Sequence, residues 1–241
     1  MNNINRYISG KYYQKNHHYH AEDAEFKWNN FLKILKKSNI NFNEINSIAD
    51  VGCGSGKILA EAKKSNFFSE KCIYEGFDIN PDAIKLAKQR DDNINFFNSD
   101  FINIEEKYND LILASDVFEH IENSYEFLIK LKEKGNLFLF NIPLEINLFS
   151  MVREKNIFQD SYDKVGHLHF YTKKTAILLL ESCGYKISKF IFVDNRLKEL
   201  KDKKDIKKFI IYVFQYLLGL ISKNLACSIF GGYSLVVLAK K

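Results

Sequence analysis

The chain has 241 residues, of which 46% are hydrophobic and 27% charged, so it can form a sizeable core and is not wholly disordered. Four cysteines are too few for a disulfide scaffold, and two prolines with eleven glycines exclude collagen-like or linker-rich architectures. The formal net charge of +5 is mildly basic and falls short of the signature of a nucleic-acid-binding protein. The length predicts a single domain over residues 1–241.

The N-terminus and the cysteines predict a cytoplasmic protein. The first residues, MNNINRYISGKYYQ, lack the apolar segment of a signal peptide. No Cys-x-x-Cys pair is present, which favours reduced thiols. The longest uncharged runs, 209–222 and 225–239, are shorter than the ~18 apolar residues of a spanning helix. We therefore expect no transmembrane segment, although the 209–222 run could pack on the core, on another subunit or weakly on a membrane surface. The oligomeric state stays open.

Strand and helix patterns alternate along the chain. An N-terminal arm, residues 1–43, is rich in His and Tyr and includes a helix expected at about 21–37. In chain order the later elements are a strand at 45–51, a helix at 57–64, a strand at 72–77, a helix at 81–90, strands at 94–97 and 110–114, a helix at 124–134, a strand at 136–142, a helix at 173–182, a strand at 185–193, a helix at 209–222 and a final strand at 234–239. The alternation predicts an α/β fold, a doubly wound parallel sheet with helices on both faces.

The segment 143–171 interrupts this alternation because it shows no clear period. A segment of that length is expected to be a functional insertion or a lid. It divides the predicted domain into a half at 44–142 and a C-terminal half at 172–241. Open α/β sheets bind ligands at the carboxyl ends of their strands, so we expect the insertion to face a site there.

A glycine-rich turn, Asp50-Val51-Gly52-Cys53-Gly54-Ser55-Gly56, follows the first strand and opens a helix. Glycines there allow a positive φ and let the backbone approach a ligand closely. The turn lacks the Gly-Lys-Ser/Thr of a P-loop, which disfavours a nucleoside triphosphate. Its G-x-G-x-G spacing also differs from the G-x-G-x-x-G of dinucleotide enzymes.

Acidic residues follow the next two strands. Asp78 ends the second strand, where a carboxylate can accept hydrogen bonds from both ribose hydroxyls. Asp100 and Phe101 follow the third strand, where a carboxylate can accept from an adenine amino group while the ring packs on the base. The glycine turn and these residues, in order at successive strand ends, indicate a site for an adenine nucleoside.

The motifs DVGCGSG, GFDINPDAI, NSDF and SDVFEHI together resemble those of class I S-adenosylmethionine-dependent methyltransferases. The resemblance covers about residues 45–142, and GHLHFYTKKTAILLLESCGYKI extends it. It implies a Rossmann-like sheet of seven strands, mostly parallel, whose last strand is antiparallel. S-adenosyl-L-methionine would be the cofactor and S-adenosyl-L-homocysteine the product. The resemblance implies these cofactor-binding residues: Asp50, Gly52, Cys53, Gly54 and Gly56 around the methionine part, Asp78 and Ile79 on the ribose, Asp100 and Phe101 on the adenine, and Asp116 and Val117 beside the methyl group.

His120 is the candidate catalytic base. It lies four residues after Asp116, and an imidazole takes up a proton near neutral pH, as methylation of a hydroxyl requires. Its alternative role is a packed histidine that orients the turn. The Asp-to-His spacing is similar to that of phosphoethanolamine methyltransferases, and ubiquinone-pathway O-methyltransferases have a similar Glu-His-hydrophobic sequence, so the motif leaves the acceptor open.

Candidate acceptor-binding residues come from two segments. The arm carries Tyr12, Tyr13, His17 and His20, which could close over the cofactor, and Tyr19 is a further tyrosine there. The insertion carries Arg153, His167, His169 and Tyr171, and loops of this kind commonly hold the substrate. No cysteine or carboxylate stands at a usual ligand spacing beside the histidines, so we predict no metal.

The sequence therefore predicts an O-methyltransferase acting on a small molecule or glycan. The leading acceptor is a sugar hydroxyl in bacterial surface-glycan or capsule biosynthesis, by analogy of overall layout. A phosphoryl-type group, or another small molecule, is the alternative. A nucleic-acid methyltransferase is disfavoured, since SDVFEH replaces the Asn/Asp-Pro-Pro-aromatic motif expected after the fourth strand. A cofactor-binding subunit without catalysis is the remaining class.

Overall fold

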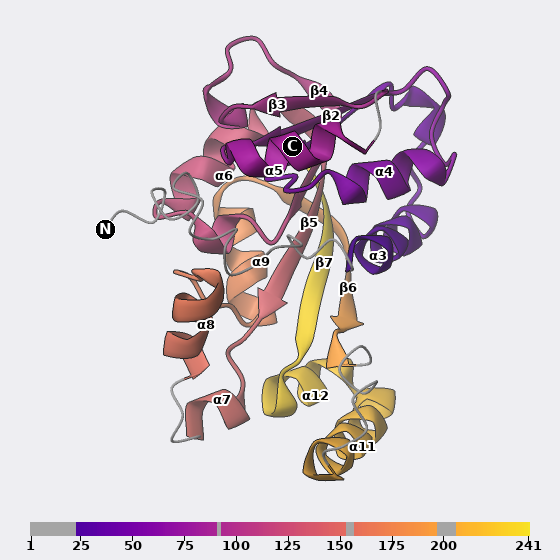
Figure 1. The fold of residues 1–241 in the computed structure, drawn as a ribbon. Coiled ribbons are helices and arrows are strands. Elements are labelled where there is room, and N and C mark those ends of the chain that lie inside the picture. The colour runs from indigo at the N-terminus through magenta and orange to yellow at the C-terminus, as the bar shows by residue number, and fades with distance from the viewer. Residues whose placement is uncertain (1–22, 91–92, 153–156, 197–205) are drawn as a thin grey trace.

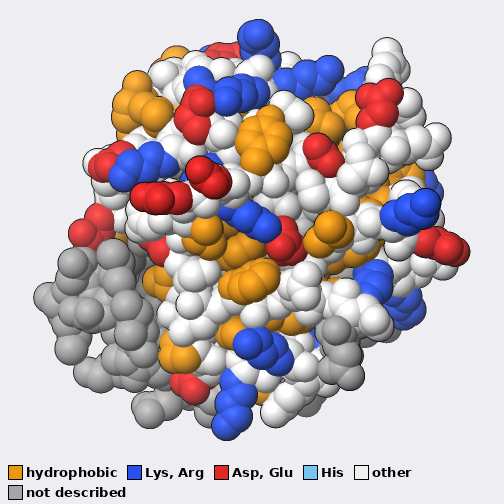
Figure 2. Space-filling view, turned by 90° about the horizontal axis from the view of Figure 1, so that it is seen from above, with side chains coloured by type: hydrophobic (Ala, Val, Ile, Leu, Met, Phe, Trp, Pro, Cys, Tyr) orange, Lys and Arg blue, Asp and Glu red, His pale blue; other side chains and the backbone are white. Residues whose placement is uncertain are grey.

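The computed structural model describes residues 23–90, 93–152, 157–196 and 206–241 (Figure 1). Within these ranges no helix is long and apolar enough to cross a membrane. The four cysteines are free and buried, as the sequence predicted. Acidic and basic side chains are interspersed on the end of the molecule seen from above (Figure 2), which agrees with a mild net charge without one large basic face on that side.

The core of the molecule is a sheet of seven strands in the order β3-β2-β1-β4-β5-β7-β6. All strand pairs are parallel except those of β7, which runs antiparallel to β5 and β6. The strands are β1 (Ser47–Val51), β2 (Ile73–Asp78), β3 (Asn95–Asn98), β4 (Asn109–Ser115), β5 (Gly135–Leu144), β6 (Lys186–Asp194) and β7 (Tyr233–Lys240). The predicted mostly parallel, Rossmann-like sheet is confirmed. Strand β4 is buried along almost its whole length, as its continuous apolar run predicted.

Helices cover both faces of the sheet (Figure 1). One face packs against α3 (Ala24–Lys36), α4 (Lys57–Lys64) and α5 (Pro81–Lys88), which contribute Trp28, Leu59 and Ile84 to one apolar core. The other face packs against α6 (Ser124–Lys132), α9 (Lys173–Ser182) and α12 (Lys223–Phe230), which contribute Phe127, Leu180 and Ala226 to a second core. Two layers of helices around one sheet are the doubly wound arrangement that the alternation predicted.

The ends of the predicted helices follow their sequence signals. The Asn80 side chain caps α5 by accepting from the backbone N–H of Asp82 at 2.8 Å, and Pro81 occupies the first helical position. Thr172 caps α9 through a capping box with Thr175. Gly184 takes a φ of 85° just after α9, where a left-handed residue ends the helix.

Two regions contain helices that the sequence pattern did not predict. The aperiodic insertion forms α7 (Leu148–Val152) and α8 (Ile157–Val165), which are too short to show a clear period. The second uncharged run, 225–239, begins in the helix α12 and becomes a strand only at residue 233. Ser222 caps this helix by accepting from the Leu225 N–H, and Gly231, with a φ of 65°, ends it. The predicted 209–222 helix lies mainly within α11 (Ile206–Ile221).

Candidate active site

A cavity of about 690 Å³ opens at the carboxyl ends of the parallel strands. Its walls come from the glycine turn after β1, from the ends of β2 and β4, from η3 (Phe101–Asn103) after β3, and from α3. Nine of the predicted cofactor-binding residues line it: Gly52, Cys53, Gly54, Asp78, Ile79, Asp100, Phe101, Asp116 and Val117. The ends of four neighbouring strands thus bring together residues up to 65 positions apart in sequence.

The glycine turn has a left-handed backbone, with φ of 71° at Gly52 and 53° at Gly54. The Gly52 N–H donates to the Phe77 carbonyl at 2.8 Å, which holds the turn against β2. A Cβ at Gly52 would lie 2.8 Å from Val117 Cγ2, so only glycine fits between these strands. Gly56 also needs glycine, with φ of 71°, but it does not line the cavity. Its missing Cβ instead makes room for the ring of Phe96.

Asp78 is fixed by the backbone on either side of it. Its Oδ2 accepts from the Gly54 N–H at 2.9 Å and its Oδ1 from the Asn80 N–H at 2.8 Å. Burial raises the pKa of Asp78, while these two hydrogen bonds act in the opposite direction. Each oxygen keeps a free lone pair for a further donor. The side chain is therefore held in one orientation at the cavity wall.

Asp100 and Phe101 lie on different sides of η3. The Phe101 ring is buried against Phe77 at a centroid distance of 4.8 Å. Asp100 is exposed and caps η3, accepting from the Ile102 N–H at 3.3 Å and from Asn103 Nδ2 at 2.8 Å. Both line the cavity beside Ile79. This corner thus offers an apolar wall and an exposed carboxylate, as recognition of an adenine ring requires.

Asp50 lies below the turn and outside the cavity lining. It is 1% exposed, and its Oδ2 has no hydrogen-bond partner among the described residues. Burial, followed by the nearby Asp78 carboxylate, raises the pKa of Asp50 to about 8, although Lys27 lowers it. A buried carboxyl oxygen without a partner is costly, which is consistent with a site that is completed when a ligand with donor groups binds.

Asp116 is held in the left-handed region with φ of 56°, which is rare for a residue other than glycine. Its Oδ2 pairs with Lys27 Nζ at 2.7 Å, and its Oδ1 accepts from Asn141 Nδ2 at 2.9 Å. Burial alone would raise the pKa of Asp116, but the charge of Lys27 and these hydrogen bonds outweigh it and lower the pKa. The pKa of Lys27 is raised by the same pair, although burial opposes it. Both groups are therefore charged at neutral pH.

The predicted base, His120, lies at the end of η4 (Phe118–His120) and lines the cavity. Burial, followed by the charge of His167, lowers the pKa of His120 to about 4. The rings of His120 and His167 meet edge to face with centroids 4.7 Å apart, and a hydrogen bond to the Gly166 backbone holds His120. His167 Nδ1 in turn contacts Glu145 Oε2 at 2.6 Å. The imidazole of His120 is therefore neutral and oriented at neutral pH.

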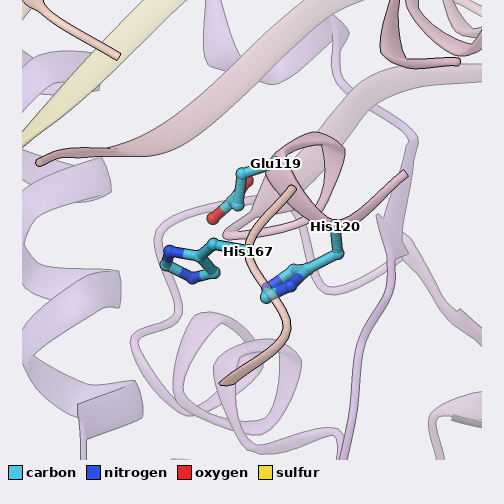
Figure 3. A group of neighbouring side chains, drawn as sticks. All are labelled: Glu119, His120 and His167. Atoms are coloured by element: carbon cyan, nitrogen blue, oxygen red, sulfur yellow. The ribbon is translucent and has the colours of Figure 1, made fainter. Parts of the chain in front are cut away.

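Glu119 points toward the same place (Figure 3). It is fully buried, and neither of its carboxylate oxygens has a hydrogen-bond partner among the described residues. Burial, followed by Asp116, raises its pKa well above the usual range. The backbone carbonyl of Glu119 accepts from the Leu168 and His169 N–H groups at 2.8 and 3.1 Å, which pins the insertion to η4.

Glu119, His120 and His167 could together hold a metal ion, since one ligand atom from each lies within 4.8 Å of the others. A carboxylate and two imidazoles suit a divalent transition metal. The histidines weighed for a metal from the sequence included His167 but not His120. Glu119 was not singled out, and its sole signal was its place beside His120 in the SDVFEHI motif.

The remaining predicted acceptor-binding residues are not all brought to the cavity. His167 lines it. His169 does not, because its Nε2 contacts the Ile121 carbonyl at 2.9 Å. Tyr171 is buried in the core against Phe118, with ring centroids 5.5 Å apart. These two side chains position the insertion. Tyr12, Tyr13, His17, His20 and Arg153 lie outside the described residues.

Other cavity residues had no sequence signal. Lys27 and Asn30 reach the cavity from α3, and Asn141 from β5. Asn195 and Ser234 line its far wall, where Asn195 Nδ2 donates to Ser234 Oγ at 2.7 Å. Each is a polar residue in an otherwise ordinary helix or strand, so its role depends on packing between elements that are distant in sequence.

A family profile described as "methyltransferase domain" matches residues 43–209. This chain belongs to that methyltransferase family. The predicted membership among class I S-adenosylmethionine-dependent methyltransferases is thereby confirmed, and S-adenosylmethionine is the methyl donor that membership implies. Nine of the residues predicted to bind it meet in the cavity described above.

Similar proteins of known name or structure are methyltransferases as well. Ubiquinone biosynthesis O-methyltransferases of Rickettsia typhi and Rickettsia bellii are each 26% identical over 141 and 144 residues, which is 54% and 56% of this chain. The matches span 56% and 59% of those relatives' own length. A methyltransferase structure from Archaeoglobus fulgidus has a TM-score of 0.59 at 23% identity, covering 90% of this chain and 94% of that one. A magnesium protoporphyrin IX methyltransferase from Synechocystis, with bound SAH, has a TM-score of 0.58 at 12% identity, covering 92% and 83%. These likenesses confirm the fold.

Proposed function

We propose that the protein is an O-methyltransferase that methylates a hydroxyl group of a small molecule. The observation that carries the proposal is a neutral, oriented imidazole, His120, in the same cavity as the glycine turn and Asp78. An alcohol must lose its proton as it attacks, so a base in this place fits methylation of oxygen. The named activity of the Rickettsia relatives supports the same reaction.

The residues around the glycine turn fit S-adenosylmethionine. When bound, this group supplies a methyl on a positively charged sulfur that is an excellent leaving group. Gly52 and Gly54 would let the backbone approach the methionine part, and Asp50, buried beneath the turn, would support it from below. Asp78 would accept from the ribose hydroxyls, and Asp100 would accept from the adenine amino group while Phe101 packs beside it.

His120 acts as the general base in this proposal. With a pKa lowered to about 4, its imidazole is unprotonated at pH 7, which is the form that a base must have before it takes the hydroxyl proton. The Gly166 backbone and the His167 ring hold its plane, which fixes the direction of proton transfer. His167, itself held by Glu145, is a positioning residue.

Alignment and exclusion of water are the chain's other contributions. The ion pair between Lys27 and Asp116 connects α3 to the end of β4, so it closes one side of the cavity beside His120. In-line displacement gains most of its rate from holding the reacting atoms in line and from keeping water away. We propose that this pair fixes the wall against which acceptor and methyl donor are aligned.

The acceptor is proposed to have an apolar body beside its hydroxyl. Phe26, Ile58, Val165 and Val193 line the cavity together with His120. Apolar walls with a few polar groups are typical of pockets for small molecules. The sequence favoured a sugar hydroxyl of a surface glycan, for which the similar proteins provide no support. We therefore keep the proposal that the acceptor group is a hydroxyl, and we propose that the molecule carrying it has both apolar and polar parts.

Calorimetry followed by a transfer assay tests the proposal. S-adenosylmethionine and S-adenosylhomocysteine should each bind one site per chain, and radiolabelled methyl should appear on a hydroxyl when catechols, phenols and sugars are offered. Binding without transfer to any hydroxyl, but with transfer to amines, would overturn the O-methylation proposal. Absence of binding would remove the cofactor assignment itself.

A further inference from the structure

Helix α11 carries its apolar residues on the outside of the molecule. Eight of the twenty large hydrophobic side chains that are exposed among the described residues belong to this one helix. Leu220 is 68% exposed and Ile221 is 84% exposed. A monomeric protein rarely leaves so large an apolar surface uncovered, and a surface of this kind marks an interaction site.

The exposed residues form one continuous stripe. They recur at the spacing of a single helix face: Ile210, Val213, Phe214, Leu217, Leu220 and Ile221. The opposite side packs on the rest of the molecule through Gln215, Gly219 and Leu218, the last of which contacts the core. Gln215 is fully buried and donates to the Gly231 carbonyl at 3.1 Å, and Gly219 faces the Tyr233 hydroxyl. The helix is thus held to the molecule on one side and presents a continuous apolar face outward on the other.

Two neighbouring helices extend this apolar surface. In Figure 1, α7, α12 and α11 lie side by side at the lower end of the molecule. Leu148, Met151 and Val152 of α7 are all more than half exposed, and Leu225 of α12 is 45% exposed. Phe149 of α7 packs against Phe230 of α12, which joins the helices into one surface. We call these three helices the apolar end.

The charges at the apolar end are all of one sign. From Ile206 to the last residue the sequence contains no Asp or Glu, whereas Lys207 and Lys208 precede the apolar stripe and Lys223 follows it. The opposite end of the molecule, seen in Figure 2, carries acidic and basic side chains intermixed. Within the three helices the only charged residues beside the apolar ones are lysines, although Asp205 stands directly before α11 in the sequence and Asp194 acts on Tyr212 of this helix. An apolar stripe flanked mainly by cations is complementary to a surface that is apolar inside and negatively charged outside.

We infer that the apolar end docks on a lipid bilayer that contains anionic lipids. With 16 residues, α11 is about 24 Å long, shorter than the ~30 Å hydrocarbon core, so it would lie in the plane of the interface. Phe214 and Leu217 would enter the boundary between headgroups and acyl chains, while the lysines contact anionic headgroups. A second copy of the chain fits this surface less well, because the lysines of the two copies would face and repel each other.

The docking surface lies close to the cavity. Strand β7 begins at Tyr233 directly after α12, and Ser234 lines the cavity, as does Pro143 in β5, which leads into α7. The bilayer would therefore approach the edge of the sheet where the acceptor binds. This surface does not depend on the identity of the acceptor or on methyl transfer.

Vesicle co-sedimentation of the full chain tests the inference. We expect at least tenfold tighter partitioning into vesicles of 70% phosphatidylcholine and 30% phosphatidylglycerol than into pure phosphatidylcholine, with most of this difference lost in 0.5 M NaCl. Leu217→Glu should weaken binding to the anionic vesicles about tenfold. Leu178→Glu, at a 65% exposed leucine of α9, is the matched control and should stay within twofold of wild type.

Other outcomes would overturn the inference. Equal binding of the Leu217→Glu and Leu178→Glu proteins, or no binding of wild type to either vesicle, excludes a lipid surface. A dimer in sedimentation velocity that Leu217→Glu abolishes, without vesicle binding by wild type, identifies a second copy as the occupant. Lys207→Gln with Lys208→Gln keeps the apolar face intact and should weaken anionic binding severalfold even if Leu217→Glu fails to fold. Cofactor titration of the wild type reports on the methyltransferase proposal separately.

Discussion

The cofactor side and the acceptor side of the cavity are built in different ways. On the cofactor side, Asp78 is held by the N–H groups of Gly54 and Asn80, which lie in the turns that follow β1 and β2. On the acceptor side, His120 packs against His167 of the insertion, and Lys27 of α3 pairs with Asp116 at the end of β4. Backbone turns thus fix the first side, whereas the second depends on side chains that pack across long sequence separations.

The two sides also differ in the charge state of their carboxyl groups. Burial raises the pKa values of Asp50 and Asp78 beneath the glycine turn. The Lys27 ion pair lowers the pKa of Asp116, although that carboxyl is buried as well. Asp50, with a pKa of about 8, is thus mainly protonated at neutral pH, whereas the direct ion pair with Lys27 keeps Asp116 charged.

Removal of the proposed base should give the largest effect. His120→Ala should lower turnover about 100-fold, since general bases contribute 10²–10⁴, and should leave the affinity for S-adenosylmethionine within about twofold. Steady-state transfer assays and calorimetry measure the two quantities. His169→Ala is the matched control, because that imidazole bonds a backbone carbonyl outside the cavity lining. Equal turnover in His120→Ala and wild type would assign His120 to packing.

A chelator decides between a free base and a metal at the same place. We expect EDTA to leave turnover unchanged, in keeping with the prediction of no metal. A loss with EDTA as large as that in His120→Ala, restored by a divalent cation, would show instead that Glu119, His120 and His167 hold an ion.

The next largest effect should come from replacing Asp78, whose loss should weaken cofactor binding. Asp78→Asn is expected to weaken S-adenosylmethionine binding by about 10- to 100-fold, the usual value of hydrogen bonds to a charged group. The amide also loses one of the acceptors that orient Gly54 and Asn80. Calorimetry measures the change, and Asp82→Asn, at an exposed site in the first turn of α5, is the control. Unchanged affinity in Asp78→Asn would contradict the ribose-binding role.

This difference between the two sides explains what the sequence could and could not predict. Nine of the eleven residues named from the sequence for this side line the cavity, because glycines with positive φ and an Asp at a strand end are local requirements. Gly56 and Asp50 are the exceptions: the space at Gly56 is taken by Phe96, and Asp50 lies buried outside the cavity lining. On the acceptor side, Lys27 and Glu119 were missed and Tyr171 was placed in the wrong environment. Their surroundings depend on how α3, η4 and the insertion pack together, which no local pattern encodes.

The smallest effect expected is on stability, through Asp50. Its pKa is about 8 in the folded chain, against about 4 when unfolded, so between these pH values the unfolded state releases a proton that the folded state keeps. Folding stability should therefore fall as pH rises from about 4 to 8. Asp50→Asn cannot ionise and removes this contribution. Between pH 6 and 8 we expect the melting temperature of wild type to fall by about 4 °C more than that of Asp50→Asn, corresponding to roughly 1–2 kcal/mol.

Differential scanning fluorimetry without cofactor, at matched ionic strength, measures this difference. Asp82→Asn again serves as the control, because its exposed carboxylate should give a melting curve parallel to wild type at every pH. If the melting temperatures of Asp50→Asn and wild type changed equally with pH, Asp50 would ionise at its ordinary pKa and would be charged beneath the glycine turn at neutral pH. A steeper fall in wild type than in Asp50→Asn would instead show that the folded protein keeps the buried Asp50 carboxyl protonated, as its raised pKa predicts.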